Sequence, residues 1–173
     1  MLCLSCDMNR SVIELVDCVD IYDYEGKYKE EYMIDNSRPK VITQMTAVSL
    51  KKNLENTPIG KIDRIIRDNP DFEFIFYIDY LDQKDTLYVM KLLEKYQCKF
   101  PVILDFEVKF QEKNFGPKER YGSIGFICDE KNRVYGRSII GTDMSFFDKE
   151  FAKSKREMKY KENNRKKDSS SSL

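Results

Sequence analysis

Residues 72–78 constrain the fold most strongly, because six of these seven residues are aromatic or β-branched. The run is too short for a helix of typical length and suits a strand buried on both faces. Residues 59–66 precede it and residues 87–96 follow it, each with apolar side chains at helical spacing. A central strand between amphipathic helices predicts an α/β domain.

The first half of the chain is divided by proline-containing turns. Residues 40–44 read as a short strand that enters the core domain. Thr57-Pro58 is typical of an N-cap followed by the first residue of a helix, which predicts a new helix at this point. Asn69-Pro70 then ends that helix, because the residue before a proline avoids the α region.

The second half predicts further strands and a final helix. Residues 100–105 read as extended chain, and residues 106–121 as loop or irregular turn. Two strands follow, at residues 124–128 and 133–140, and Ser145 opens the last helix in the manner of a capping box.

The apolar pattern divides the chain into four parts. Residues 1–10 resemble the remnant of a lipoprotein signal, and residues 11–37 predict a β-hairpin extension that turns at Glu25-Gly26. Residues 38–156 form the predicted α/β domain. Residues 157–173 predict a disordered, basic and serine-rich tail, because they have too little apolar surface to offset the entropy of ordering.

The absence of histidine excludes several kinds of chemistry. With 0 His, the chain has no Ser-His-Asp or Cys-His nucleophile and no histidine-ligated metal. No phosphate-binding glycine loop occurs among the 7 glycines, and we expect no cofactor and no metal. The 30 basic and 30 acidic residues cancel, which argues against a nucleic-acid partner.

The five cysteines are Cys3, Cys6, Cys18, Cys98 and Cys128. They are too sparse and too widely spaced for a disulfide-stapled miniprotein or a zinc module. Cys3 and Cys6 form a Cys-x-x-Cys, but it precedes any predicted strand instead of starting a helix. Ser5-Cys6 fits a lipid-acceptor site, which makes Cys6 the candidate attachment point, and the other interpretation is a frayed end without a targeting role.

Three segments resemble known sequences. Residues 100–105 (Phe-Pro-Val-Ile-Leu-Asp) are similar to the "FPVLLD" segment of thiol-disulphide reductases of the TlpA type. Residues 125–129 resemble their "TFLID" segment, and residues 129–134 resemble the "D-x-x-G-x-V" turn. The resemblance is closest to thioredoxin-like lipoproteins of gut bacteria and covers residues 38–152. It implies a thioredoxin-like mixed central sheet flanked by helices.

The resemblance also locates a missing redox site. The family has Cys-x-x-Cys where its first helix starts, but residues 43–53 of this chain contain no cysteine. Ser123 stands at the position of the family's cis-proline. We therefore expect a degenerate site and a non-catalytic domain that binds an unknown protein or peptide. Its predicted surface is rimmed by Met45, Thr46, Ala47 and Ser123.

Two alternatives stay open. The protein could instead be a thiol-disulphide redox enzyme that uses noncanonical cysteines among Cys18, Cys98 and Cys128, although the apolar setting of Cys128 suits a buried small hydrophobe. The resemblance to lipoproteins predicts a bacterial cell envelope protein whose only membrane contact is a lipid anchor. Without an upstream start codon, the prediction becomes a cytoplasmic domain.

Overall fold

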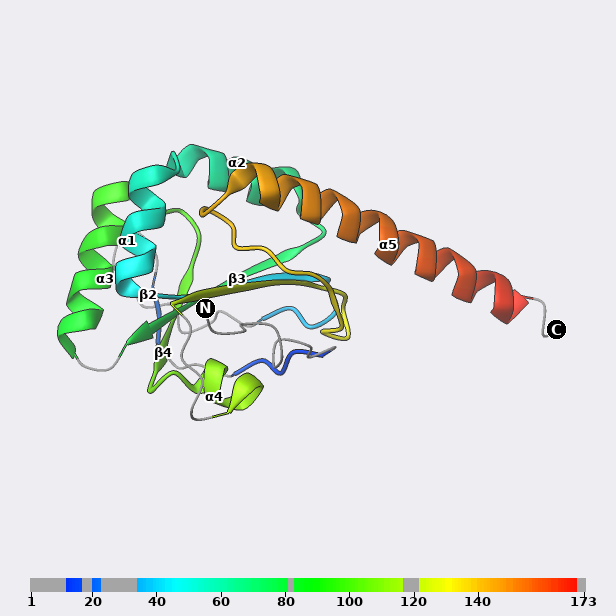
Figure 1. Ribbon diagram of the computed structural model, residues 1–173, viewed down its shortest axis with the longest axis horizontal. Coiled ribbons are helices and arrows are strands. Elements are labelled where there is room, and N and C mark those ends of the chain that lie inside the picture. The colour runs from blue at the N-terminus through cyan, green and yellow to red at the C-terminus, as the bar shows by residue number, and fades with distance from the viewer. Residues whose placement is uncertain (1–11, 17–19, 23–33, 81–82, 117–121, 171–173) are drawn as a thin grey trace, which may run out of the picture.

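In a computed structural model of the chain, the described residues are 12–16, 20–22, 34–80, 83–116 and 122–170 (Figure 1). The elements follow one another as β1 (Asp20–Tyr22), β2 (Lys40–Thr46), α1 (Ala47–Asn56), α2 (Ile59–Asp68), β3 (Glu73–Tyr80), α3 (Gln83–Tyr96), β4 (Val102–Phe106), α4 (Lys109–Phe115), β5 (Ser123–Cys128), β6 (Val134–Gly136) and α5 (Met144–Ser170).

The strands form one mixed sheet of six strands in the order β1-β4-β3-β2-β5-β6. Strands β2, β3 and β4 are parallel, whereas β1, β5 and β6 run antiparallel to their neighbours. The strand predicted at residues 72–78 is β3, which lies inside the sheet between β2 and β4. The predicted mixed sheet flanked by helices is therefore confirmed.

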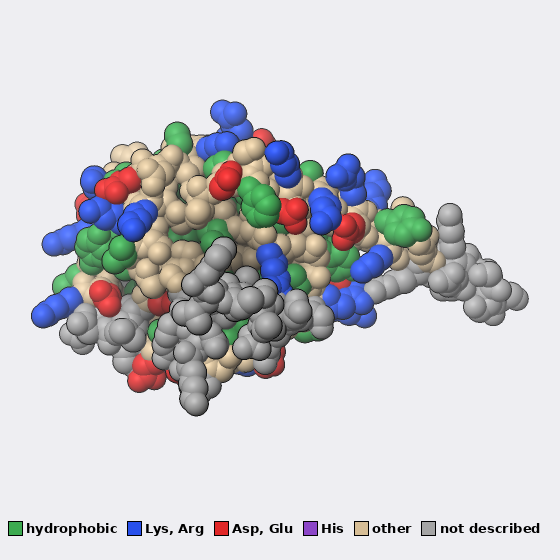
Figure 2. Space-filling view, in the orientation of Figure 1, with side chains coloured by type: hydrophobic (Ala, Val, Ile, Leu, Met, Phe, Trp, Pro, Cys, Tyr) green, Lys and Arg blue, Asp and Glu red, His purple; other side chains and the backbone are tan. Residues whose placement is uncertain are grey.

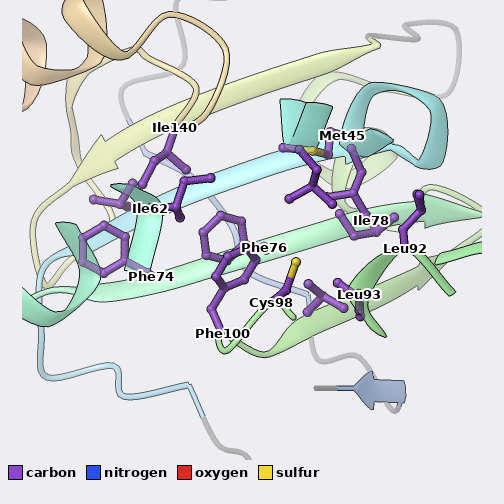
Figure 3. Close-up of a cluster of buried hydrophobic side chains, with 14 of the residues drawn as sticks. Met45, Ile62, Phe74, Phe76, Ile78, Leu92, Leu93, Cys98, Phe100 and Ile140 are labelled. Atoms are coloured by element: carbon purple, nitrogen blue, oxygen red, sulfur yellow. The ribbon is translucent and has the colours of Figure 1, made fainter. Parts of the chain in front are cut away.

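The sheet separates two hydrophobic clusters because successive strand side chains point to opposite faces. Phe74 and Phe76 of β3 belong to the first cluster, which α1, α2, α3 and α5 cover (Figures 1 and 3). Ile75 and Tyr77 belong to the second cluster, on the face that carries α4. Both faces of the central strands are thus buried, as their near-continuous apolar sequence requires.

The break between α1 and α2 lies where Thr57-Pro58 predicts it, with one difference. The Thr57 N–H donates to Asn53 O at 2.9 Å, so Thr57 ends α1 instead of capping α2. Its hydroxyl donates to the Gly141 carbonyl, in the chain that leads to α5. A side chain predicted to cap a helix therefore ties the helical layer together.

The predicted loop at residues 106–121 contains a helix, α4, which is a correction to the sequence analysis. Both oxygens of Asp105 accept backbone N–H groups at the start of α4, from Lys109 at 3.0 Å and from Phe110 at 2.8 Å. The Phe110 ring stacks on Tyr77 at 4.7 Å between centroids. The cap comes from the end of the preceding strand β4, whereas the packing partner Tyr77 comes from the distant strand β3, and local sequence does not reveal that second contact.

The C-terminal half also differs from the expected boundaries. Strand β6 ends at Gly136 instead of residue 140. Helix α5 runs on to Ser170, through most of the segment predicted to be disordered, and projects beyond the body (Figures 1 and 2). Asp143 caps α5, since its side chain accepts the Phe146 N–H at 3.0 Å, so Ser145 does not have the predicted role. The first part of the segment predicted to be disordered packs on the body, since Met158 lies against the first hydrophobic cluster and Lys161 Nζ is 4.6 Å from the centroid of the Tyr135 ring.

The N-terminal region is only partly described. Strand β1 adds to the free edge of β4, with Ile21 opposite Ile103. Residues 12–16 lie across the second face of the sheet, where Ile13 is buried. The predicted hairpin turn at Glu25-Gly26 lies outside the described residues. Among the helices described, none has the length and hydrophobicity needed to cross a bilayer.

Candidate functional site

The junction of β2 and α1 is where the resemblance places the missing redox site. Thr46 is the N-cap of α1, with extended backbone angles of φ −74° and ψ 161°. Its hydroxyl oxygen accepts the Ser49 N–H at 3.2 Å and lies 3.1 Å from the Ser49 hydroxyl oxygen. Thr46 and Ser49 therefore have the spacing of a Cys-x-x-Cys pair, with hydroxyls in place of thiols.

The start of β5 lies directly beside this junction. The Thr46 N–H donates to Gly122 O at 3.1 Å, and Ser123 is the register partner of Met45. A Cβ on Gly122 would be 3.7 Å from the Ser49 hydroxyl oxygen. Three segments distant in sequence thus meet: the end of β2, the first turn of α1 and the first residues of β5.

The four predicted rim residues lie together, but they do not contribute equally to the surface. Met45 is 2% exposed and Ala47 is 6% exposed, so their side chains belong to the core. Thr46 and Ser123 are half-buried and reach solvent. Ser49 completes the surface and was missed, although its three-residue spacing from Thr46 was the available signal.

An apolar pocket of about 250 Å³ begins at Ser123 and extends along β5. Phe126 of β5 forms one side, and Ile139 and Phe146 form the other. Phe146 is 52% exposed although it is a large aromatic residue. Apolar pockets with a few polar groups are the ordinary form of ligand-binding sites in proteins.

Within the part of the chain that the structure describes, strand β6 covers only one end of the outer edge of β5. Strand β6 pairs with β5 at Ile127 and Cys128, and the register is irregular there. The chain then leaves the edge, and a Cβ on Gly125 would overlap the Ser138 carbonyl that crosses above it. Among the described residues, β6 therefore does not extend along β5 to Ser123.

A buried carboxylate lies on the strand next to the site. Asp79 of β3 is the register partner of Thr46 and is 7% exposed. One of its oxygens accepts Gln111 Nε2 at 2.8 Å and also Gln44 Nε2. The Gln111 amide anchors α4 to the sheet, the Gln44 amide links β2 to β3, and the sequence analysis did not identify this cluster. Within the residues described, no three His, Cys, Asp or Glu side chains form a metal-binding group.

The two described cysteines are free and fully buried, and the sheet separates them. Cys98 lies in the first cluster, beside Phe76 and Leu93 (Figure 3), and Cys128 lies in the second. Burial raises the pKa of each thiol to about 12. The thiolate is the reactive form, so neither cysteine is activated for exchange. Cys3, Cys6 and Cys18 lie outside the described residues.

No protein-family model matches the sequence, and no curated protein sequence matches it significantly. Solved structures do match the fold. A candidate thiol:disulfide interchange protein DsbE from Chlorobium tepidum superposes with a TM-score of 0.51 at 12% identity, covering 69% of this chain and 81% of its own. The chain has a thioredoxin-like fold.

Two further structures have the same relationship to this thioredoxin-like domain. A candidate protein disulfide isomerase from Bacteroides thetaiotaomicron has a TM-score of 0.50 at 13% identity, covering 83% of this chain and 91% of its own. An uncharacterised conserved protein from Geobacillus kaustophilus has a TM-score of 0.50 at 12% identity, covering 78% and 72%. At these identities the similarity establishes the fold alone, and the chemistry has to be argued from the residues present.

Proposed function

We propose that this thioredoxin-like domain is non-catalytic and binds a protein or peptide segment at the surface formed by Thr46, Ser49, Gly122 and Ser123. The observation that carries the proposal is the Thr46–Ser49 hydroxyl pair, whose oxygens are 3.1 Å apart at the start of α1. A neutral hydroxyl pair cannot exchange with a disulfide, because that reaction needs a thiolate to attack sulfur. The pair does offer hydrogen bonds to a partner.

The pocket beside Ser123 supports a partner with an apolar side chain. Its lining includes Phe126, Ile139 and the half-exposed Phe146, so an apolar group would lose contact with water there. Ser123, Arg137 and Asp143 add polar groups to the lining of the pocket. This combination of an apolar pocket and a few polar groups favours an extended segment with one bulky apolar anchor.

A redox function through noncanonical cysteines has weaker support. Cys98 and Cys128 are buried on opposite faces of the sheet, so they cannot pair with each other without unfolding. The neighbours that carry thiol-disulfide names share the fold at 12–13% identity. The activities that their names suggest therefore add little to this alternative.

Selection of peptides tests the binding function. A random linear peptide library is selected on the immobilised full chain, and enriched peptides are measured by calorimetry. We expect Ser123→Arg and Phe146→Ala to weaken binding at least about tenfold, or about 1.4 kcal/mol. The matched control is Leu87→Ala, which removes another exposed apolar side chain, on α3, and should bind as the wild type does. Equal loss in all three variants, or no enrichment, contradicts the proposal.

We propose further that the protein belongs to a bacterial envelope and carries lipid on Cys6. The support is the Ser5-Cys6 sequence and the resemblance to lipoproteins. Acyl chains contribute about 0.8 kcal/mol per buried CH₂, so a multiply acylated protein stays with the membrane. Expressed with its upstream genomic sequence, Cys6→Ser should release the protein and Cys3→Ser should not. Mass spectrometry that finds Cys6 as a free thiol in that protein would favour a cytoplasmic domain.

A further inference from the structure

Residues 12–16, here called the strap, lie in a groove between α4 and the second face of the sheet. The strap is not a strand of the sheet. In the described part of the chain, the strap pairs with the sheet through one isolated bridge, Val12 with Arg133, and a hydrogen bond from the Ile13 N–H to Asn132 O at 2.9 Å. The strap therefore resembles a bound extended peptide more than an integral strand.

Two apolar side chains hold the strap in the groove. Ile13 is 1% exposed and Val16 is 8% exposed, and both belong to the second hydrophobic cluster. The intervening Glu14 is exposed and Leu15 is half-buried. The groove thus accepts apolar residues at the first and fourth positions of a four-residue segment, Leu15 at the third position packs against the same cluster, and only the second position is exposed.

The backbone between these anchors is recognised by a buried amide. Asn114 of α4 is 1% exposed, and its Oδ1 accepts the Glu14 N–H at 2.9 Å. Its Nδ2 donates to Glu14 O at 2.8 Å, and also to Phe110 O at 2.9 Å, which fixes its orientation. One amide side chain therefore binds both backbone groups of one strap residue, as a neighbouring strand would.

A buried hydroxyl, that of Tyr77, binds the N–H and the carbonyl oxygen of Val16. Tyr77 of β3 is 0% exposed, and its hydroxyl accepts the Val16 N–H at 3.3 Å and donates to Val16 O at 3.0 Å. Its ring stacks on Phe110, which holds the hydroxyl at the groove. Lys113 of α4 adds a bond from Nζ to Leu15 O at 2.9 Å.

The groove is costly to leave empty. If the strap departed, the Asn114 amide and the Tyr77 hydroxyl would exchange the strap backbone for water, and the apolar surface that Ile13 and Val16 cover would be exposed, which is unfavourable. None of these contacts requires that the strap belong to the same molecule as the groove. Any state with the strap released therefore favours refilling by an equivalent extended segment.

We propose that this groove is a strand-recognition site and that the strap of a second copy fills it, which yields strap-exchanged dimers. A second copy carries the required segment, with Ile13 and Val16 as anchors and a backbone that matches the same amide and hydroxyl. Within one molecule the strap has a high effective concentration, so exchange is favoured at high protein concentration or when two chains fold together. This site lies on the opposite face of the sheet from α1 and does not depend on the proposed partner-binding function.

A peptide supplied in trans tests the recognition. A fluorescent peptide with the sequence of residues 10–17 is titrated into the full chain carrying Ile13→Ala and Val16→Ala, which weaken its own strap. We expect this variant to bind the peptide at least about tenfold more tightly than the wild type does, because the wild-type groove is occupied. The same peptide with aspartate at the position of Ile13 should not bind, and Asn114→Ala added to the variant should abolish binding.

Co-refolding tests the exchange. Two differently tagged wild-type populations are unfolded together, refolded at high concentration and examined by tag capture and light scattering. We expect mixed dimers after co-refolding and none after mixing the native proteins. If only monomers form at every concentration, the proposal of strap exchange is wrong. It is also wrong if dimers still form in the Ile13→Ala, Val16→Ala variant. Absence of peptide binding to this variant, while it still melts cooperatively, overturns the recognition site itself.

Discussion

The hydroxyl oxygens of Thr46 and Ser49 lie 3.1 Å apart across the first turn of α1. The N-terminus of a helix stabilises a thiolate, so cysteines at these two positions would have the setting that lowers a thiol pKa. We expect the double variant Thr46→Cys, Ser49→Cys to form a reversible disulfide. It should also reduce insulin at least about tenfold faster than the wild type does.

The control for this gain of function is Thr46→Cys alone, which provides an attacking thiol without a resolving partner. It should form mixed disulfides with glutathione and show no sustained insulin reduction. If the double variant folds but forms no internal disulfide, the first turn of α1 does not have the geometry described for it.

The native protein should be nearly inert toward thiol reagents at Cys98 and Cys128. With a pKa of about 12, roughly one thiol in ten thousand is ionised at pH 8. In a Cys3→Ser, Cys6→Ser, Cys18→Ser background, DTNB should react with both remaining cysteines only after denaturant unfolds the chain. Rapid modification of either one in buffer would restore the redox alternative.

Stability should depend on pH through Asp105. Burial raises the pKa of this carboxyl group, and the backbone N–H groups of Phe110 and Lys109 oppose the shift only in part. The pKa of Asp105 is higher in the folded state than in the unfolded state. Its contribution to the free energy of unfolding is therefore fully present below the unfolded-state pKa and is lost as the pH rises through the folded-state pKa. We compare the free energies of unfolding of the wild type and of Asp105→Asn. The wild-type value minus the variant value should fall from pH 4 to pH 7. Urea titrations across this range measure it, and a difference that rises with pH refutes the assignment.

Gly125 should not tolerate alanine. The new Cβ would overlap the Ser138 carbonyl oxygen and lie 2.7 Å from its carbon, and both atoms belong to the backbone. Overpacking of this kind costs about 1–3 kcal/mol, which we expect as a melting temperature lower by several degrees. The matched control is Gly60→Ala in α2, where no atom lies within 4 Å of the new Cβ. It should be neutral or more stable by up to about 1 kcal/mol.

Where the sequence pattern was explicit, it predicted the elements well. The apolar run at residues 72–78 became β3, and the break at Thr57-Pro58 became the boundary of α1 and α2. The candidate surface was located at the end of β2 and the start of β5, although Met45 and Ala47 are buried there. Local patterns predict β3 and the boundary of α1 and α2 because hydrophobic period and proline geometry act within a few residues, whereas the position of the candidate surface came from the family resemblance.

The sequence by itself determined the α/β class, the absence of histidine chemistry and the absence of cysteine at the start of α1. The tertiary structure alone decided that α4 forms, that Cys98 and Cys128 lie on opposite faces, and that Ser49 joins Thr46 and Ser123. It also decided that Asn114 and Tyr77 bind the backbone of residues 12–16, across sequence separations of 100 and 61 residues. Such contacts depend on which segments the sheet brings together, and no local propensity encodes that arrangement.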